Sequence, residues 1–306
     1  MADGGEGVET TKRWQRHRTL VLGGVVGGLI AVASLSGCTA DAIRPDDSAH
    51  AYLDSVSGEI VMPLDEYAFY GRHADHQVFK AAARAVIVEC VKSKGFTTSP
   101  ARTQPDPATD LDDRTFGLWE EQRAARYGFA FAASPMDVAL ENARAAGGVQ
   151  WSAAYDACNQ GDESVIDTMD AVTPPQDERL NSLASRLESE ALTRAQKDER
   201  WQRAREPWEQ CLKEAGLTPE SGEHYMSKQS NALPESYGGS SSEEGIRLAS
   251  IEARCNTESR LTQTLADLEA AYQQPLIDAN QAALNEEKER KQQLLVAARE
   301  YIAAHG

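Results

Sequence analysis

The chain contains one ten-residue pattern twice, as Ile87-Val88-Glu89-Cys90-Val91-Lys92-Ser93-Lys94-Gly95-Phe96 and again as Trp208-Glu209-Gln210-Cys211-Leu212-Lys213-Glu214-Ala215-Gly216-Leu217. In both copies lysine follows the cysteine by two residues, and glycine follows it by five, with an apolar residue next. Glycine just past the last apolar position is a common helix stop, because it adopts a left-handed backbone conformation without a steric penalty. Each copy therefore predicts the last turns of a helix with its cysteine at a core position.

A second cysteine follows each pattern, in Asp156-Ala157-Cys158-Asn159 and in Ala253-Arg254-Cys255-Asn256. This repetition indicates a duplicated helical module whose connectors differ in length. Of the three pairings that four cysteines allow, it selects Cys90 with Cys158 and Cys211 with Cys255. Each disulfide would stabilise the fold by roughly 3–4 kcal/mol in the chain-entropy treatment. A zinc site or a redox-active pair is the alternative, and the lack of C-x-x-C spacing argues against both.

The sequence predicts a mainly α fold with little or no sheet. We expect a signal peptide over residues 1–37, a flexible tether over 38–58, and two cysteine-paired helical units over 59–175 and 176–306, the second with a long C-terminal helix. The best strand candidate is Gly58-Glu59-Ile60-Val61, and an extended lead into the first helix fits it equally well.

Several helix boundaries are marked by proline and glycine. Ser134 followed by Pro135 predicts a capped helix start, and Gly147-Gly148 predicts the end of that helix. Pro275 is expected to end the helix that carries Leu261, Leu265, Leu268 and Tyr272, because proline lacks the N–H that continues a helix.

Two of the long helices have charged centres, at residues 193–200 and 285–291. Apolar ends with a polar centre favour helices that partly protrude from the body or brace it. An antiparallel helix pair is one interpretation, and a solvated surface is the other.

The charge balance excludes some partners. The chain has 48 acidic and 31 basic residues and a formal net charge of −17. Such a protein is repelled by nucleic acid and by anionic lipid headgroups, so neither is expected as a primary ligand.

The N-terminus has the three parts of a secretory signal. A basic cluster of Lys12, Arg13, Arg16 and Arg18 precedes an uncharged apolar run at residues 20–35, and small residues follow it. The run of 16 residues is shorter than the roughly 20 that a membrane-spanning helix needs.

The closing tetrapeptide Leu35-Ser36-Gly37-Cys38 resembles the lipobox of bacterial lipoproteins. The resemblance implies cleavage before Cys38 and a diacylglyceryl thioether on its sulfur, which would hold the mature chain at the extracytoplasmic face of the cell membrane. An uncleaved short anchor and an ordinary signal peptide are the alternatives. With its two cysteine-bearing helical repeats, the chain resembles secreted lipoproteins of unknown function from actinobacteria, and this likeness implies no activity.

Familiar catalytic and cofactor motifs do not occur in the sequence, so we expect neither an enzyme nor a bound cofactor. His73 and His76 would offer two metal ligands on a helix, but the spacing suggests no third, and no metal site is predicted. Glu120 and Glu121 are adjacent on a helix and diverge by about 100°, which makes them a poor acid–base pair.

An acidic segment and an aromatic segment adjoin each other. The acidic one lacks the alternating order of a calcium loop, and we expect a solvated loop formed by Asp106, Asp110, Asp112 and Asp113. The aromatic one, residues 116–131, is expected to pack in the core, with a binding surface as the alternative.

Three functions remain. The first is a non-catalytic adapter whose helical body docks on another envelope or membrane protein. The second is a lipoprotein that binds a small ligand or peptide for a transporter, and the scarcity of strands counts against a classical α/β binding domain. The third is a cell-wall enzyme, which would need a catalytic cluster that the sequence does not show.

Overall fold

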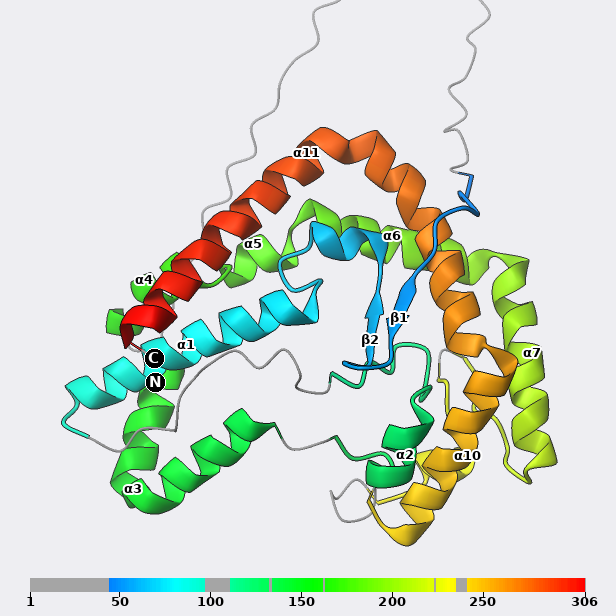
Figure 1. Ribbon diagram of the computed structural model, residues 1–306, viewed down its shortest axis with the longest axis horizontal. Coiled ribbons are helices and arrows are strands. Elements are labelled where there is room, and N and C mark those ends of the chain that lie inside the picture. The colour runs from blue at the N-terminus through cyan, green and yellow to red at the C-terminus, as the bar shows by residue number, and fades with distance from the viewer. Residues whose placement is uncertain are drawn as a thin grey trace, which may run out of the picture. The chain divides into compact units, whose positions relative to one another are not determined.

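The described part of the chain is almost wholly helical. The computed structural model describes residues 44–96, 111–131, 134–161, 163–222, 224–234 and 241–305. Among these residues the sheet structure is limited to one two-stranded antiparallel hairpin. The predicted mainly α fold is therefore confirmed (Figure 1). The elements in chain order are β1 (Tyr52–Asp54), β2 (Glu59–Val61), the 3-10 helix η1 (Pro63–Glu66), α1 (His73–Ser93), α2 (Glu121–Tyr127), α3 (Pro135–Asn159), α4 (Glu163–Val172), α5 (Gln176–Leu180), α6 (Leu183–Lys197), α7 (Glu199–Glu214), α8 (Lys228–Asn231), α10 (Glu243–Ser259) and α11 (Leu261–His305).

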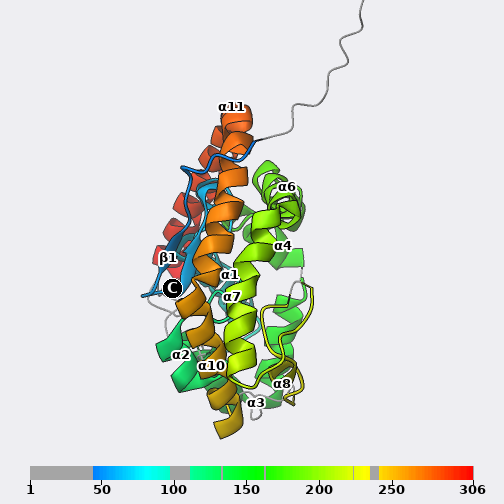
Figure 2. The same ribbon diagram turned by 90° about the vertical axis from the view of Figure 1, so that its right-hand side faces the viewer.

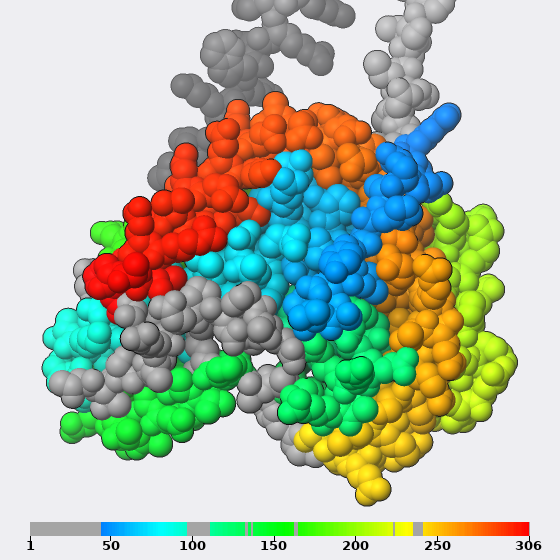
Figure 3. Space-filling view, viewed as in Figure 1, coloured from blue at the N-terminus to red at the C-terminus, as the bar shows by residue number. Residues whose placement is uncertain are grey.

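The long helix α11 links three hydrophobic clusters of residues 43–306, which form one compact unit. Its first part packs with α7 and α10, and Figure 2 shows these three helices alongside one another. Its middle packs with η1 and α6. Its last part packs with α1 and α4, and the space-filling view shows its red end lying against the cyan residues of α1 (Figure 3).

Each of the two outer clusters contains one of the expected cysteine pairs. The sulfur atoms of Cys90 and Cys158 are 2.02 Å apart, and those of Cys211 and Cys255 are 1.95 Å apart. The first pair joins α1 to α3, and the second joins α7 to α10. The pairing predicted from the repeat is thus confirmed. The glycine stops are confirmed too, since Gly95 and Gly216 have φ of 91° and 78°.

The prediction that Pro275 ends a helix is wrong. Proline has no N–H to donate to the carbonyl four residues earlier, which here belongs to Ala271. That carbonyl instead accepts a hydrogen bond of 2.8 Å from the backbone N–H of Asp46. Because an outside donor satisfies the freed acceptor, and because Leu276 and Ile277 are buried just beyond, α11 continues through the proline.

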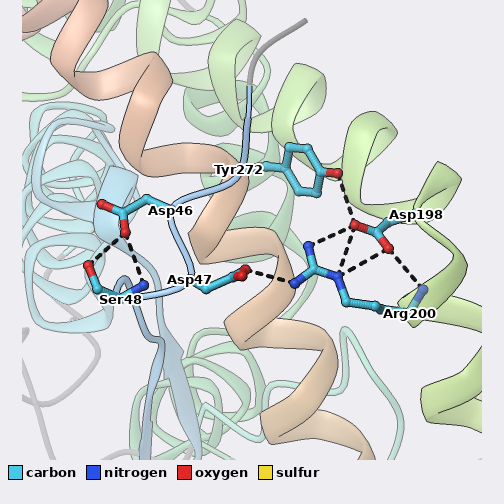
Figure 4. Close-up of polar contacts among 6 residues, drawn as sticks. All are labelled: Asp46, Asp47, Ser48, Asp198, Arg200 and Tyr272. Atoms are coloured by element: carbon cyan, nitrogen blue, oxygen red, sulfur yellow. Dashed lines mark hydrogen bonds and ion pairs between the residues drawn. The ribbon is translucent and has the colours of Figure 1, made fainter.

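The segment at residues 46–51, here called the lead segment, is docked on the body. Asp46 bonds to α11 as described, and Asp47 accepts a 2.7 Å bond from Arg200, whose guanidinium also holds Asp198 (Figure 4). Ala51 is buried, and its N–H donates to Asp267 at 3.0 Å. The flexible tether predicted for residues 38–58 therefore ends earlier than expected, because the lead segment and β1 belong to the body.

The two helices expected to have charged centres pair in antiparallel fashion. Glu287 of α11 accepts hydrogen bonds from the N–H groups of Leu183 and Ala184 at the start of α6. At the other end of α6, the Tyr272 hydroxyl donates to Asp198 at 3.0 Å. The paired arrangement is thus found, and the charge is largely solvated as well, because Glu286, Glu289 and Arg290 are exposed. The charged run at residues 193–200 spans the junction of α6 and α7 and not the centre of one helix.

The glycine pair in α3 produces a kink. Ser134 caps the helix as predicted, and its Oγ accepts the Asp137 N–H at 3.0 Å. Gly148 has a non-helical backbone with φ of 71° and ψ of −167°, so one helical segment of α3 ends here and a second begins in a new direction, as the glycine pair predicted. A side chain at Gly147 would lie only 2.5 Å from Cβ of Trp151, so the adjacent glycine allows a buried tryptophan to pack closely.

The loop length between the cysteines predicts their contribution to stability. Replacing Cys90 and Cys158 with alanine should lower the free energy of unfolding by about 3–4 kcal/mol, because the unfolded chain regains the entropy of a closed loop. Urea denaturation of the variant and of the unchanged protein, both oxidised, measures the difference. An unchanged midpoint would show that the Cys90–Cys158 pair does not restrain the unfolded chain.

Candidate functional site

A cavity of about 710 Å³ lies between β2, η1, α5, α6 and the first half of α11. Residues 111–116 complete its wall. Apolar side chains that include Ile60, Phe69 and Phe116 line it together with an unusual number of carboxyl groups. The volume falls within the range of small-molecule sites, roughly 300–1,000 Å³.

Three of these carboxyl groups are buried: Glu59, which pairs with Arg72 at 3.3 Å, and Asp65 and Glu269, which have no ion-pair partner among the described residues. Asp65 lies in η1, and its Oδ2 accepts the Met62 N–H at 2.6 Å. Glu269 lies on α11, and its Oε1 accepts a 3.0 Å bond from the Gln273 side chain. Gln273 in turn accepts the Leu64 N–H at 2.9 Å, so α11 and η1 hold the two acids in place together.

Burial raises the pKa of both acids far above the ordinary range. Burial removes water from the carboxyl group of Asp65 and raises its pKa to about 7, with smaller effects from nearby charges such as Glu188. The same cause, together with Glu188 and Asp65 itself, raises the pKa of Glu269 to about 8. Both groups therefore retain protons near neutral pH.

Two more carboxyl groups extend this acidic surface. Glu188 on α6 is partly open to solvent by its accessible surface. Protein atoms nevertheless surround its carboxyl group, and the resulting loss of hydration, followed by the charge of Asp113, raises the pKa of Glu188. Asp113 is half-buried and accepts the Thr115 N–H at 2.9 Å. None of Asp65, Asp113, Glu188 and Glu269 forms an ion pair with a residue that the structure describes.

This arrangement favours the binding of a cation. A positive group among the acids would supply the missing counter-charge and favour their ionised forms, with release of protons. The described residues contain no group of three or more histidine, cysteine, aspartate or glutamate side chains placed to hold a metal ion. The apolar part of the wall suits the carbon skeleton of an organic cation.

The residues that the sequence singled out mostly lie elsewhere. Cys38, Asp106 and Asp110 fall outside the described residues. His73 and His76 lie in the first turn of α1; the ring of His76 lies at a tilt of 32° against the ring of Tyr70, and burial lowers the pKa of His76 to about 4. Asp112 pairs with Arg114, so of the four loop aspartates only Asp113 is seen at the cavity.

Glu120 and Glu121 flank the start of α2, away from the cavity wall. The aromatic segment serves mainly as core, because Phe116 is 2% exposed and contacts the ring of Trp201 edge-on at 5.7 Å. Asn256, beside Cys255, donates a 2.9 Å hydrogen bond to the Phe116 carbonyl. Phe131, by contrast, is 60% exposed.

Sequence reasoning missed Asp65, Glu188 and Glu269, the acids that define the cavity. One signal was present for Glu269, which follows Leu265 by four residues and so falls on the apolar face of its helix. A carboxyl in such a stripe is either paired or functional. Asp65 and Glu188 gave no comparable signal.

Comparison with known proteins adds no identity: no family model, no curated protein and no solved structure matches the chain. Within the described residues, no helix is both long enough and apolar enough to cross a bilayer.

The raised pKa of Glu269 predicts how stability depends on pH. Because the folded protein holds a proton that the unfolded chain releases above about pH 4.5, the free energy of unfolding should fall as pH rises towards 8. Glu269→Gln removes this loss, and we expect it to raise the free energy of unfolding at pH 8 by about 2 kcal/mol, or Tm by roughly 4–8 °C.

Thermal unfolding of both proteins at pH 5 and pH 8 measures the effect. Glu286→Gln, at an exposed position of the same helix, is the control and should follow the unchanged protein. Equal pH slopes for Glu269→Gln and the unchanged protein would contradict the raised pKa.

Proposed function

We propose that the chain is a lipid-anchored extracytoplasmic protein whose acidic cavity binds a small organic cation. The observation that carries the proposal is the pair of buried carboxyl groups, Asp65 and Glu269, in a cavity of about 710 Å³. Of the functions that the sequence left open, this corresponds to the ligand-binding lipoprotein.

The energetics support a cationic ligand over a neutral or anionic one. Each buried acid costs stability when it ionises without a partner, and an ammonium group offsets that cost by ion pairing. An anion placed beside Asp65, Glu188 and Glu269 would add repulsion. The net charge of −17 also raises the local concentration of cations near the protein.

The anchor is part of the same proposal. Its support is the basic cluster, the apolar run and the tetrapeptide that ends in Cys38. A binding protein held at the membrane surface would keep its ligand close to a transporter. The adapter role and the cell-wall enzyme remain predictions, and the acidic cavity favours the binding role over both.

Binding of the triamine spermidine tests the cavity. We expect isothermal titration calorimetry of the full chain in detergent to show saturable binding that tightens by about tenfold between pH 6 and pH 8, because the acids lose their protons over that range. Proton release should accompany binding, and buffers of different ionisation enthalpy reveal it.

Variants separate the cavity from general attraction to an acidic surface. Glu269→Gln should weaken spermidine at least tenfold, which corresponds to about 1.4 kcal/mol. Glu286→Gln should leave it unchanged, although it removes the same charge from an exposed position of α11. Equal weakening by both variants, or no saturable binding at pH 8, would refute the cavity as a cation site.

The anchor has its own test. In a bacterial host that processes lipoproteins, the mature protein should enter the detergent phase, and mass spectrometry should find a diacylglyceryl group on Cys38. Cys38→Ser should move the protein to the aqueous phase. Recovery of the unchanged protein in the aqueous phase with an unmodified Cys38 would rule the anchor out.

A further inference from the structure

The cavity wall also carries positive charge, in Arg179 at the end of α5 and Arg186 in the first turns of α6. The two residues flank one corner of the fold, because the carbonyl of Arg179 accepts a 3.4 Å hydrogen bond from Ser185, the neighbour of Arg186. We call this the α5–α6 corner. Its guanidinium groups are the only side chains of positive charge among the described residues of the cavity wall.

Neither arginine forms an ion pair with a residue that the structure describes. The acids that could neutralise them are engaged elsewhere: Glu178 lies 3.3 Å from Arg290, and Glu190 lies 2.6 Å from Arg194. The Arg179 guanidinium lies over the ring of Tyr70 at 5.3 Å, which orients it through a cation–π contact. Two guanidinium groups without a carboxylate partner, one of them oriented by a tyrosine ring, offer hydrogen-bond donors to an oxyanion.

The positive and negative charges of the cavity are separated. Asp65 and Glu269 lie where η1 meets α11; the charge of Glu188 acts on both acids, and the charge of Asp65 acts on Glu269. The charge of Arg179 instead acts on Tyr70 and His76, beyond the end of η1. A ligand that spans the cavity therefore meets the carboxyl groups of Asp65 and Glu269 at one end and the guanidinium group of Arg179 at the other, and Arg186 and Glu188 both line the wall from α6.

We propose that the cavity binds an amphoteric ligand, a short basic peptide whose ammonium groups lie among Asp65, Glu188 and Glu269 and whose terminal carboxylate lies between Arg179 and Arg186. This inference rests on the proposed function and specifies its ligand class. A carboxylate fits better than a phosphate, because a phosphate carries a charge of about −1.5 to −2, which the neighbouring acids would repel more strongly. The volume of about 710 Å³ suits a di- or tripeptide.

Lysyl-lysine and its C-terminal amide are matched probes, since they differ only in the terminal carboxylate. We expect calorimetry with the full chain at pH 8 to show at least tenfold tighter binding of lysyl-lysine. The net charge of the protein would favour the amide, which is the more positive peptide, so this order of affinity cannot come from general attraction.

The arginines are tested by the double variant Arg179→Gln/Arg186→Gln. It should lose the preference for the free carboxylate while it still binds spermidine, which shows that the fold and the acidic end are intact. Arg203→Gln, at an exposed position of α7 outside the cavity wall, is the control and should keep the preference.

The outcomes separate this inference from the proposed function. If the amide binds as tightly as the free peptide, or if spermidine binds and neither peptide does, the amphoteric ligand is wrong and the cation site stands. If the peptides and spermidine all fail to bind, the proposed function fails as well. If the double variant retains the preference, the carboxylate does not lie at the α5–α6 corner, and the inference is overturned.

Discussion

The fold depends on the continuity of α11 through Pro275. Three hydrophobic clusters lie along this one helix, and its last part supplies Leu294, Leu295, Ala298 and Ile302 to the cluster around α1. Had the helix ended at the proline, these side chains would have no fixed path to that cluster. Continuity requires a donor for the Ala271 carbonyl, and the backbone of Asp46 provides it. A contact between residues 225 positions apart thus supports the whole arrangement.

The same helix carries Glu269, a buried carboxyl group of the cavity whose ionisation lowers the stability of the fold. Glu269 lies among Leu265, Leu268 and Tyr272, where an apolar side chain would be expected to stabilise the fold more. Charged groups kept in such positions cluster at functional sites, where a local loss of stability accompanies binding or catalysis. The rigid contacts around α11 allow the protein to tolerate this loss, since Gln273 links the carboxyl group directly to η1.

The sequence predicted the features that depend on local patterns. The glycine stops after Cys90 and Cys211, and the pairing of each with a later cysteine, follow from a repeat that can be read along the chain. Pro275 could not be interpreted in the same way, because its effect depends on a donor from the distant lead segment. The cavity was even harder to predict from the sequence. Asp65, Glu188 and Glu269 come from three separate elements, and only the tertiary fold brings them together. The charged runs of α6 and α11 fell between these cases, since the sequence allowed both an antiparallel pair and a solvated surface and could not decide between them.

The docked lead segment also limits how far the protein can stand from a membrane. With the lipid on Cys38, as proposed, seven residues, or eight Cα-to-Cα steps, separate the anchor from Asp46 in the lead segment. A fully extended chain covers at most about 3.4 Å per step, so this tether is no longer than roughly 27 Å. The body would then work within one protein diameter of the lipid headgroups, so any protein that it contacts would have to lie at the same membrane, while a small ligand could still diffuse to the cavity. A longer tether would let the body reach positions farther from the membrane, whereas this tether would keep the body at the bilayer surface.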